Sequence, residues 1–275
     1  MRFTAEQIGQ LARTALEQEA RLTPKPGLVD AENSGAHDDM DLALLLKSAS
    51  ALEPFFAQFA AQGMLDAALS PEGRLATIRA NGREAEAAMF AATNGINTHK
   101  GALFLIGTLC YVAGHCAANE VILHPQFVCT TAARVCRGIT QELGTNAGRA
   151  YAHFGARGAR GEAEDGFPHA LLAAEAYAHA KSLGAGEDDA WLLALLQLIA
   201  TIDDANVLAR CGEETAHTLG QRAGEIALRY PAGGSGLDEE ISALDCDCRS
   251  WNASPGGAAD LLACAMFLHT LTENC

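Results

Sequence analysis

Apolar residues recur along most of the chain at spacings of three or four positions, which places them on one face of an α-helix. The first such stripe consists of Ile8, Leu11, Ala15 and Leu16. The alternation of apolar and polar positions that marks a half-buried strand is almost absent. The pattern predicts an all-α fold of about ten helices, over residues 4–20, 40–61, 71–92, 99–118, 125–141, 166–183, 187–210, 213–229, 237–248 and 255–272.

Three of these helices have a capping signal at their start. Thr4 and Gln7 match the capping box, in which a hydroxyl and an amide three residues later bond each other's main chain. Ser70 and Ser254 each precede a proline, which suits a capping hydroxyl followed by proline at the first helical position. Glycine and proline gather between the helices, at 22–38, 93–98, 155–168 and 231–236.

The two longest apolar stretches, at 101–114 and 190–202, are shorter than the roughly 20 residues that cross a bilayer. They are predicted to be buried core helices, and no contact with a membrane is expected. The first twenty residues mix charges into an amphipathic pattern that does not resemble a signal peptide. No internal repeat is evident. We therefore expect one compact all-helical domain over residues 1–275 and a cytoplasmic location.

The 275 residues include 19 basic and 34 acidic side chains, a formal net charge of −15. This balance excludes a basic nucleic-acid-binding protein on overall electrostatics. With 49% hydrophobic residues the chain is not disordered by composition. Its nine cysteines form no CxxC pair, so a zinc site is not expected and the thiols are predicted to be reduced.

Several glycine- and proline-rich segments also carry polar side chains. Lys25 lies between two prolines, and a lysine held in this way suits phosphate, although the segment could also be a rigid connection. His99 and Lys100 stand at the start of an apolar helix, where main-chain N–H groups favour an anion. Residues 254–257 open another apolar helix in the same way. For either helix start taken alone, ordinary helix capping is the favoured interpretation.

The segment 157–166 is dense in charge. If it is extended, Glu162 and Glu164 point to the same side, whereas on a helix they diverge. Its glycines and Pro168 favour the extended form, with a solvated charged loop as the alternative to a functional site.

The predicted helix 187–210 places polar residues on its apolar face. Asp203, Asn206 and Arg210 fall on the stripe that begins at Leu192. Buried polar groups must pair with each other, bind a metal or line a cavity. An internal pair of Asp203 and Arg210 is the alternative to a site. Asp260 has a similar position before an apolar run.

Together these segments resemble the triphosphoribosyl-dephospho-CoA synthase family over residues 23–262. The resemblance depends on seven motifs in the family's order: TPKPGLVD (23–30), GAHDDM (35–40), GINTHKGALF (95–104), CRG (136–138), GARGEAEDGFP (158–168), DDANV (203–207) and SPGGAADLL (254–262). The chain departs from the family's usual pattern at Ala205, Cys211 and Ala258, where threonine, glycine and serine are common.

The resemblance implies a glycosyl transfer. The 2′-hydroxyl of 3′-dephospho-CoA attacks the anomeric carbon of ATP's ribose and expels adenine, and the triphosphate stays on the transferred sugar. The product would pass to an acyl-carrier-protein holo-synthase system that serves citrate lyase or malonate decarboxylase.

The resemblance and the residue types together suggest roles. Glu162 or Glu164 is expected to act as general base and to stabilise the cationic sugar, with His37 and His99 as candidates for contact with adenine or proton transfer to it. Mg²⁺ is expected at Asp203, Asp204 and Asp260. The residues expected to bind ATP or dephospho-CoA through charge, amide, hydroxyl or main-chain groups are Lys25, Asn97, Thr98, Lys100, Arg157, Arg160, Asn206, Arg210, Ser254, Gly256 and Gly257.

Three other interpretations compete. The segment from Asp203 to Gly212 also resembles the metal-binding aspartates of helical ADP-ribosyl glycohydrolases, which use water as the acceptor. His37 and Asp38 resemble the doublet of helical metal-dependent phosphohydrolases, without the further histidines. A non-enzymatic helical binding module would show no nucleotide turnover. The small apolar helix faces are compatible with a homodimer.

Overall fold

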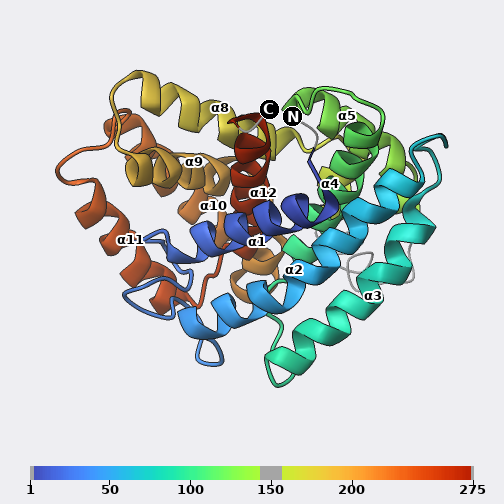
Figure 1. The fold of residues 1–275 in the computed structure, drawn as a ribbon. Coiled ribbons are helices and arrows are strands. Elements are labelled where there is room, and N and C mark those ends of the chain that lie inside the picture. The colour runs from blue at the N-terminus through green and yellow to red at the C-terminus, as the bar shows by residue number, and fades with distance from the viewer. Residues whose placement is uncertain (1–2, 143–156, 274–275) are drawn as a thin grey trace.

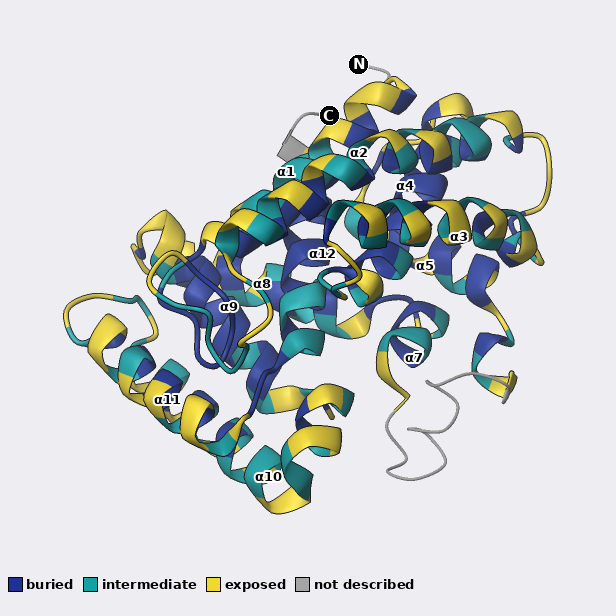
Figure 2. Ribbon diagram, turned by 90° about the horizontal axis from the view of Figure 1, so that it is seen from below, coloured by how far each residue is buried: buried dark blue, intermediate teal, exposed yellow. Residues whose placement is uncertain are grey.

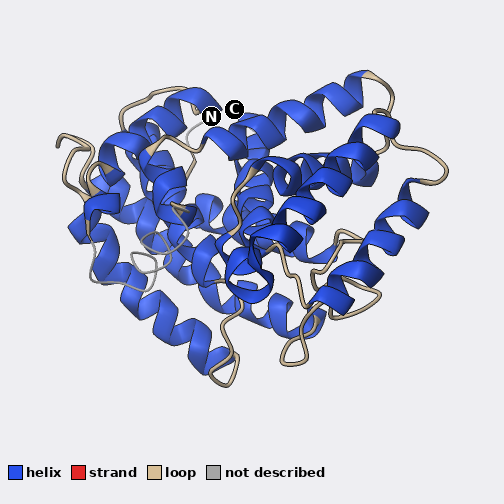
Figure 3. Cartoon of the chain, turned by 180° about the vertical axis from the view of Figure 1, so that it is seen from behind, coloured by secondary structure: helices blue, strands red, loops and turns tan. Residues whose placement is uncertain are grey.

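The structure is a computed structural model that describes residues 3–142 and 157–273. Within this part of the chain there are eleven α-helices, one 3₁₀ turn and no strand, which confirms the predicted all-α class (Figure 3). The helices are α1 (Ala5–Arg21), α2 (Leu42–Leu65), α3 (Leu75–Ala92), α4 (Lys100–Ala118), α5 (Pro125–Cys136), α7 (Gly158–Glu164), α8 (Pro168–Ser182), α9 (Glu187–Thr201), α10 (Ala205–Arg229), α11 (Leu237–Trp251) and α12 (Gly256–Glu273), with the 3₁₀ turn η1 at Ile139–Gln141.

The core is built around α4 and α12. Helices α1 and α2 run side by side across one face in Figure 1, and α2 packs on α4 while α1 packs on α12. Helices α8 and α9 cover another side of α12. In Figure 2 the buried colour concentrates on α4, α9 and α12, whereas α3, α10 and α11 carry exposed outer faces. Of the eight cysteines described as free thiols, most are buried and serve as small core residues.

Helices α2 and α4 approach closely because glycines lie at their contacts. A methyl group on Gly114 would lie 2.0 Å from the carbonyl oxygen of Ala60, and one on Gly63 would lie 1.9 Å from that of Tyr111. Only a residue without a side chain allows the two backbones to meet at this distance. Among the described helices, α4 alone is long and apolar enough by itself to cross a membrane, but 78% of its apolar window is buried inside the protein. It is the core helix that the sequence predicts.

The prediction of one helix over 187–210 is wrong. Helix α9 ends at Thr201, α10 begins at Ala205, and the chain bends by 65° between them. Asp204 causes the break by acting as the N-cap of α10, where its carboxylate accepts hydrogen bonds from the N–H groups of Asn206 and Val207. Asp203 therefore lies at a helix junction and not on an apolar stripe. The predicted boundary between residues 210 and 213 is confirmed as a kink, because Gly212, with φ of 80°, is not helical and divides α10 into two helical parts.

The prediction of an extended segment at 157–166 is also wrong. Residues Gly158–Glu164 form helix α7, so Glu162 and Glu164 point in different directions. Glu162 faces α8, while Glu164 accepts hydrogen bonds from Gly138 N, at 2.5 Å, and from the hydroxyl of Thr140. The glycines of this segment suggested an open chain, but most of them lie within the short helix.

Helix starts are predicted with mixed success. The capping box of Thr4 and Gln7 is present. Helix α3 begins only at Leu75, so the predicted cap at Ser70 is wrong. The hydroxyl of Ser254 bonds to His37 at 2.8 Å, and another residue bonds the first N–H groups of α12, as described below. Helix α5 stops at Cys136, earlier than predicted, because Gly138 adopts a left-handed conformation.

Candidate active site

A cavity of about 620 Å³ opens where α4, α7, α8, α10 and α12 meet the segment between α1 and α2. Every residue predicted to belong to the site lines this cavity except Glu164 and Arg160. Glu164 bonds to the 136–140 region, and Arg160 donates to the carbonyl oxygen of Glu142 at 3.0 Å. The structure therefore assembles most of the predicted site from segments that are far apart in the sequence, and leaves these two residues outside it.

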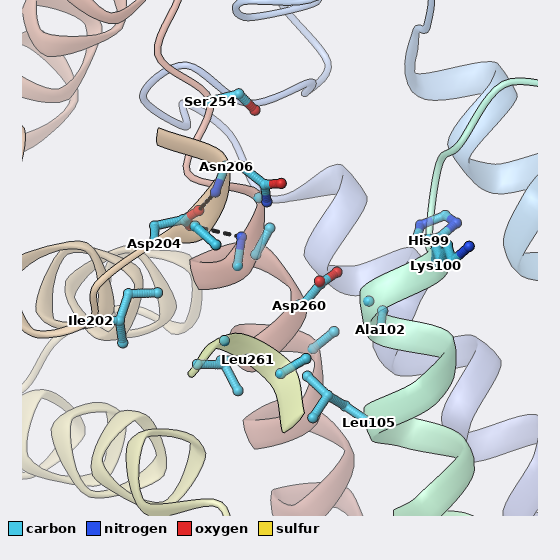
Figure 4. A pocket seen from close by; sticks show the side chains of 18 of the residues that line it. His99, Lys100, Ala102, Leu105, Ile202, Asp204, Asn206, Ser254, Asp260 and Leu261 are labelled. Atoms are coloured by element: carbon cyan, nitrogen blue, oxygen red, sulfur yellow. Dashed lines mark hydrogen bonds between the residues drawn. The ribbon is translucent and has the colours of Figure 1, made fainter. Parts of the chain in front are cut away.

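The starts of three helices at the cavity, α8, α10 and α12, are capped by two carboxylates. Glu162 accepts hydrogen bonds from the N–H groups of His169, at 2.8 Å, and Ala170, at 3.2 Å, in the first turn of α8. Asp204 serves two helices: besides capping α10, its Oδ2 accepts from Gly257 N at 2.8 Å and Ala258 N at 3.2 Å at the start of α12 (Figure 4). An anion at a helix start is stabilised by these N–H groups and by the helix dipole.

This arrangement corrects one expectation. The main-chain N–H groups of residues 254–257 were expected to donate hydrogen bonds to phosphate oxygens. Instead, Gly257 N bonds to Asp204, and Gly256 N bonds to the carbonyl oxygen of Ser254. The glycines are needed for a different reason, since a methyl group on Gly257 would lie 2.9 Å from the carboxylate of Asp204.

Asp260 projects from α12 toward the first turn of α4 (Figure 4). A methyl group on Gly101 would lie 1.9 Å from its Oδ2, so glycine is required there. Burial raises the pKa of Asp260 well above its usual range, and the charges of Asp204 and Glu19 raise it further, against a hydrogen bond from Ala102. Burial also raises the pKa of Asp204. Burial thereby favours the neutral, protonated form of Asp260, whereas at Asp204 hydrogen bonds from four main-chain N–H groups lower the pKa against the effect of burial.

The basic residues of the cavity already have partners. The ammonium group of Lys25 is buried and lies 2.6 Å from the Oε1 atom of Glu19. Lys100 bonds to Glu86 at 2.5 Å, and its side chain is half exposed. Arg210 donates to the carbonyl oxygen of Ala36 at 2.7 Å.

Arg157 bonds to Glu164 at 3.2 Å and to Asp165. A ligand that uses one of these exposed cations must compete with its present partner. The lysine in the 23–27 segment has an internal ion pair instead of an open position for phosphate.

Two histidines of the cavity are held in their neutral form. Burial, and then the charge of Lys25, lowers the pKa of His99 to about 4. Its Nδ1 lies 2.9 Å from the hydroxyl oxygen of Ser48, whereas its buried Nε2 has no partner among the described residues. Burial, and then the charge of Arg210, lowers the pKa of His37, whose Nε2 lies 2.8 Å from the hydroxyl of Ser254.

A third histidine, His169, lines the cavity and was missed by the sequence analysis. Its Nδ1 lies 2.7 Å from Oε2 of Glu162, and this hydrogen bond raises the pKa of His169 against the effect of burial. The charges of Glu162, Asp203 and Asp165 raise it further. The signal was its position immediately after the GARGEAEDGFP motif, which places it in the first turn of a helix.

Buried carboxylates and three histidines line this cavity, a set that is typical of an enzyme site on a helical fold, because a scaffold gains little from such groups. The chain matches the CitG family, described as ATP:dephospho-CoA triphosphoribosyl transferase, over residues 5–275. It is 40% identical to the 2-(5''-triphosphoribosyl)-3'-dephosphocoenzyme-A synthase of Haemophilus ducreyi, across 98% of this chain and 90% of that protein. The protein of that name from Escherichia fergusonii is 38% identical, across 96% and 90%. The chain belongs to this family of transferases.

One solved structure shares the fold, and one relative is considerably longer than this chain. A solved structure from Archaeoglobus fulgidus, described as a triphosphoribosyl-dephospho-CoA synthase, superposes with a TM-score of 0.52 over 82% of this chain and 98% of that chain. At 18% identity it supports the shared fold. The CitXG protein of Haemophilus influenzae is 36% identical, and the match covers 98% of this chain but 61% of that protein. Family membership supports the transferase interpretation and not the glycohydrolase, phosphohydrolase or binding-module alternatives.

Proposed function

We propose that this protein transfers the triphosphoribosyl group of ATP to the 2′-hydroxyl of 3′-dephospho-CoA and releases adenine. One observation carries the proposal. Six of the seven family motifs, spread from residue 23 to residue 262, contribute residues to a single cavity. The remaining motif, 136–138, bonds through Gly138 to Glu164 of α7, which supports the cavity wall. The family description names both substrates.

The reaction places positive charge on the ribose as the bond to adenine breaks. A carboxylate close to the anomeric carbon stabilises this charge. Glu162 is the glutamate available, because it is buried and lines the cavity, whereas Glu164 bonds elsewhere. We assign the stabilising role to Glu162 and give Glu164 no part in the chemistry.

The attacking hydroxyl must lose its proton as the new C1′–O bond forms. Glu162 and Glu164 were expected to accept this proton, but both already accept hydrogen bonds within the protein. We therefore propose His37 and His99 as candidates for the base, since burial favours the neutral form of both. His99 has a buried ring nitrogen without a partner among the described residues, and His37 is oriented by Ser254. Both arrangements suit an imidazole that bonds to substrate.

Two kinds of Mg²⁺ site are conceivable: one held by the protein alone and one shared with the phosphates of ATP. The residues of the cavity fit the shared site better. In the described ranges, 3–142 and 157–273, no three His, Cys, Asp or Glu side chains converge as a metal cage. Both oxygens of Asp204 accept main-chain N–H groups, whereas Asp203 is exposed at the cavity. Mg²⁺ commonly takes one or two carboxylates together with substrate phosphates, and bound in this way it would neutralise the triphosphate. We propose Asp203 as the carboxylate that holds it.

The product of the reaction needs a further enzyme system to reach its acceptor protein. We propose that it passes to an acyl-carrier-protein holo-synthase system, serving citrate lyase or malonate decarboxylase, in the cytoplasm. A homodimer is part of the same proposal.

The test combines purified protein, ATP, Mg²⁺ and 3′-dephospho-CoA, and follows free adenine together with the mass of the CoA product. We expect one adenine for each product molecule, and a product heavier by a triphosphoribosyl group. Adenine without a coupled product would instead establish a glycohydrolase. Folded protein that binds ATP without releasing adenine would contradict the proposed reaction.

A further inference from the structure

Glu162 and His169 form a buried hydrogen-bonded pair at one wall of the cavity. Oε1 of Glu162 accepts the main-chain N–H groups of His169 and Ala170, and its Oε2 lies 2.7 Å from Nδ1 of the His169 ring. The carboxylate is buried, while the ring is about one-third exposed. Main-chain and ring contacts to the same carboxyl group fix the orientation of the imidazole.

This arrangement determines which ring nitrogen can exchange a proton. A carboxylate that already accepts two N–H groups through one oxygen acts as an acceptor through the other, so the hydrogen between Oε2 and the ring lies on Nδ1 of His169. Nε2 is then the nitrogen that gains or loses a proton when a ligand is bound. Buried carboxylates that orient a histidine in this way recur at sites of acid–base catalysis.

The surroundings of His169 favour its protonated form. Glu162 lies on α7 and Asp165 directly follows it, while Asp203 lies at the junction of α9 and α10. Negative charge therefore acts on the ring from α7 and from this junction. These groups raise the pKa of His169 against burial, whereas burial lowers the pKa values of His37 and His99 in the same cavity. Opposite shifts within one site separate an acid from candidate bases.

The reaction needs such an acid. When the C1′–N9 bond of ATP breaks, its electron pair goes to adenine, which is a poor leaving group as an anion. Resting on the transfer proposed above, we propose that Nε2 of His169 donates a proton to a ring nitrogen of adenine as that bond breaks, and that Glu162 positions His169 for this step. The C1′–O bond forms to the 2′-oxygen of dephospho-CoA as the C1′–N9 bond breaks, and adenine leaves neutral with the proton from His169. The 2′-hydroxyl gives its proton to a base. After turnover the base releases that proton to solvent and His169 takes one up, so that no net proton is gained or lost.

The first test compares His169→Gln with His179→Gln, a change at an exposed histidine near the end of the same helix. We expect His169→Gln to lower kcat by roughly 10²- to 10⁴-fold with little change in KM for ATP, and His179→Gln to behave as the unaltered protein. The fall in activity of the unaltered protein at high pH, where an acid loses its proton, should be absent in His169→Gln. Equal kcat values and pH profiles for all three proteins would overturn the inference.

A second test identifies the atom that receives the proton. In 7-deaza-ATP and 3-deaza-ATP a ring nitrogen of adenine is replaced by carbon. With the analogue that lacks the accepting nitrogen, the unaltered protein should slow to the level of His169→Gln, and the substitution should cause no further loss. If His169→Gln lowers the rate by the same factor with ATP and with both analogues, His169 does not protonate adenine.

The positioning role of Glu162 requires its own measurement. In Glu162→Gln the largest cause of the raised pKa of His169 is weakened, so the NMR titration of the His169 ring and the high-pH limb of kcat should both move to lower pH. An unmoved titration would contradict the positioning role. If the unaltered protein itself released no adenine, the proposed function would fail, an outcome distinct from failure of these variants.

Discussion

At the scale of single residues, neighbouring carboxylates in the cavity have different tasks. Asp204 supplies both oxygens to main-chain N–H groups of α10 and α12, whereas Asp203 is exposed to the cavity. Sequence alone presents the two as an equivalent pair. Which one is structural depends on the break between α9 and α10, which only the folded chain reveals.

Asp203→Asn and Asp204→Asn should therefore have separable effects. We expect Asp204→Asn to lower the free energy of unfolding by about 1–3 kcal/mol, because an amide leaves capping N–H groups poorly satisfied. Asp203→Asn should leave stability within about 0.5 kcal/mol and raise the Mg²⁺ concentration needed for half-maximal adenine release. Urea unfolding and Mg²⁺ titrations of both variants provide the measurements. The assignment is wrong if Asp203→Asn is the destabilising change.

Ionisation of Asp260 should lower the free energy of unfolding as the pH rises. Its pKa in the folded protein is raised, so the folded state binds a proton that the unfolded state has already released. Its contribution to stability is complete below the unfolded pKa, near 4, and is lost as pH rises toward the folded pKa, by at most about 1.4 kcal/mol per pH unit.

Asp260→Asn removes this titration while keeping an oxygen for Ala102 N. The variant should match the unaltered protein near pH 4 and become the more stable of the two above pH 6. Urea midpoints between pH 4 and pH 8 test this expectation. A difference that stays constant with pH would show that Asp260 has no shifted titration.

At the scale of helices, periodicity predicts most elements, and local chemistry decides where they end. The spacing of apolar residues correctly indicates α1, α4, α9 and α12, because their buried stripes are long. The spacing fails at residue 204. The apolar pattern continues there, but Asp204 caps a new helix and the chain is not one continuous helix. The spacing fails again at 158–164, where glycine content concealed a short helix. The motifs predicted which residues gather, but partners such as Glu19 for Lys25 and His169 for Glu162 depend on tertiary contacts.

The contact between α2 and α4 makes a prediction about packing. In Gly114→Ala the new methyl group would meet the main-chain oxygen of Ala60 at 2.0 Å, and no side-chain rotation relieves that overlap. We expect a loss of about 3 kcal/mol, at the upper end for overpacking. Gly82→Ala is the matched control, because Gly82 lies inside α3 with open space around its Cα and should gain about 0.5–1 kcal/mol. A neutral Gly114→Ala would show that the two helices separate easily.

At the scale of the whole molecule, an acidic protein must hold polyanionic substrates. Its net charge of −15 opposes such binding from a distance, and the exposed lysine and arginine of the cavity already have carboxylate partners. Because carboxylates already cap the starts of α8, α10 and α12, the proposed compensation comes from an Mg²⁺ ion brought by the substrate. Because burial raises the pKa of Asp260 well above its usual range, the cavity is less negative than its composition indicates.

The same architecture predicts how substrate affects the stability of the whole chain. The cavity joins residues near the start of the chain, such as His37, to α7, α10 and α12, so a ligand bound there stabilises the fold as a unit. At 100 times its Kd, ATP with Mg²⁺ should add about 2.7 kcal/mol, or roughly 5–10 °C in Tm, and unfolding should remain a single transition. Differential scanning calorimetry with Mg²⁺ alone as the control measures both. A second transition that ATP does not move would show that part of the chain folds independently of the site.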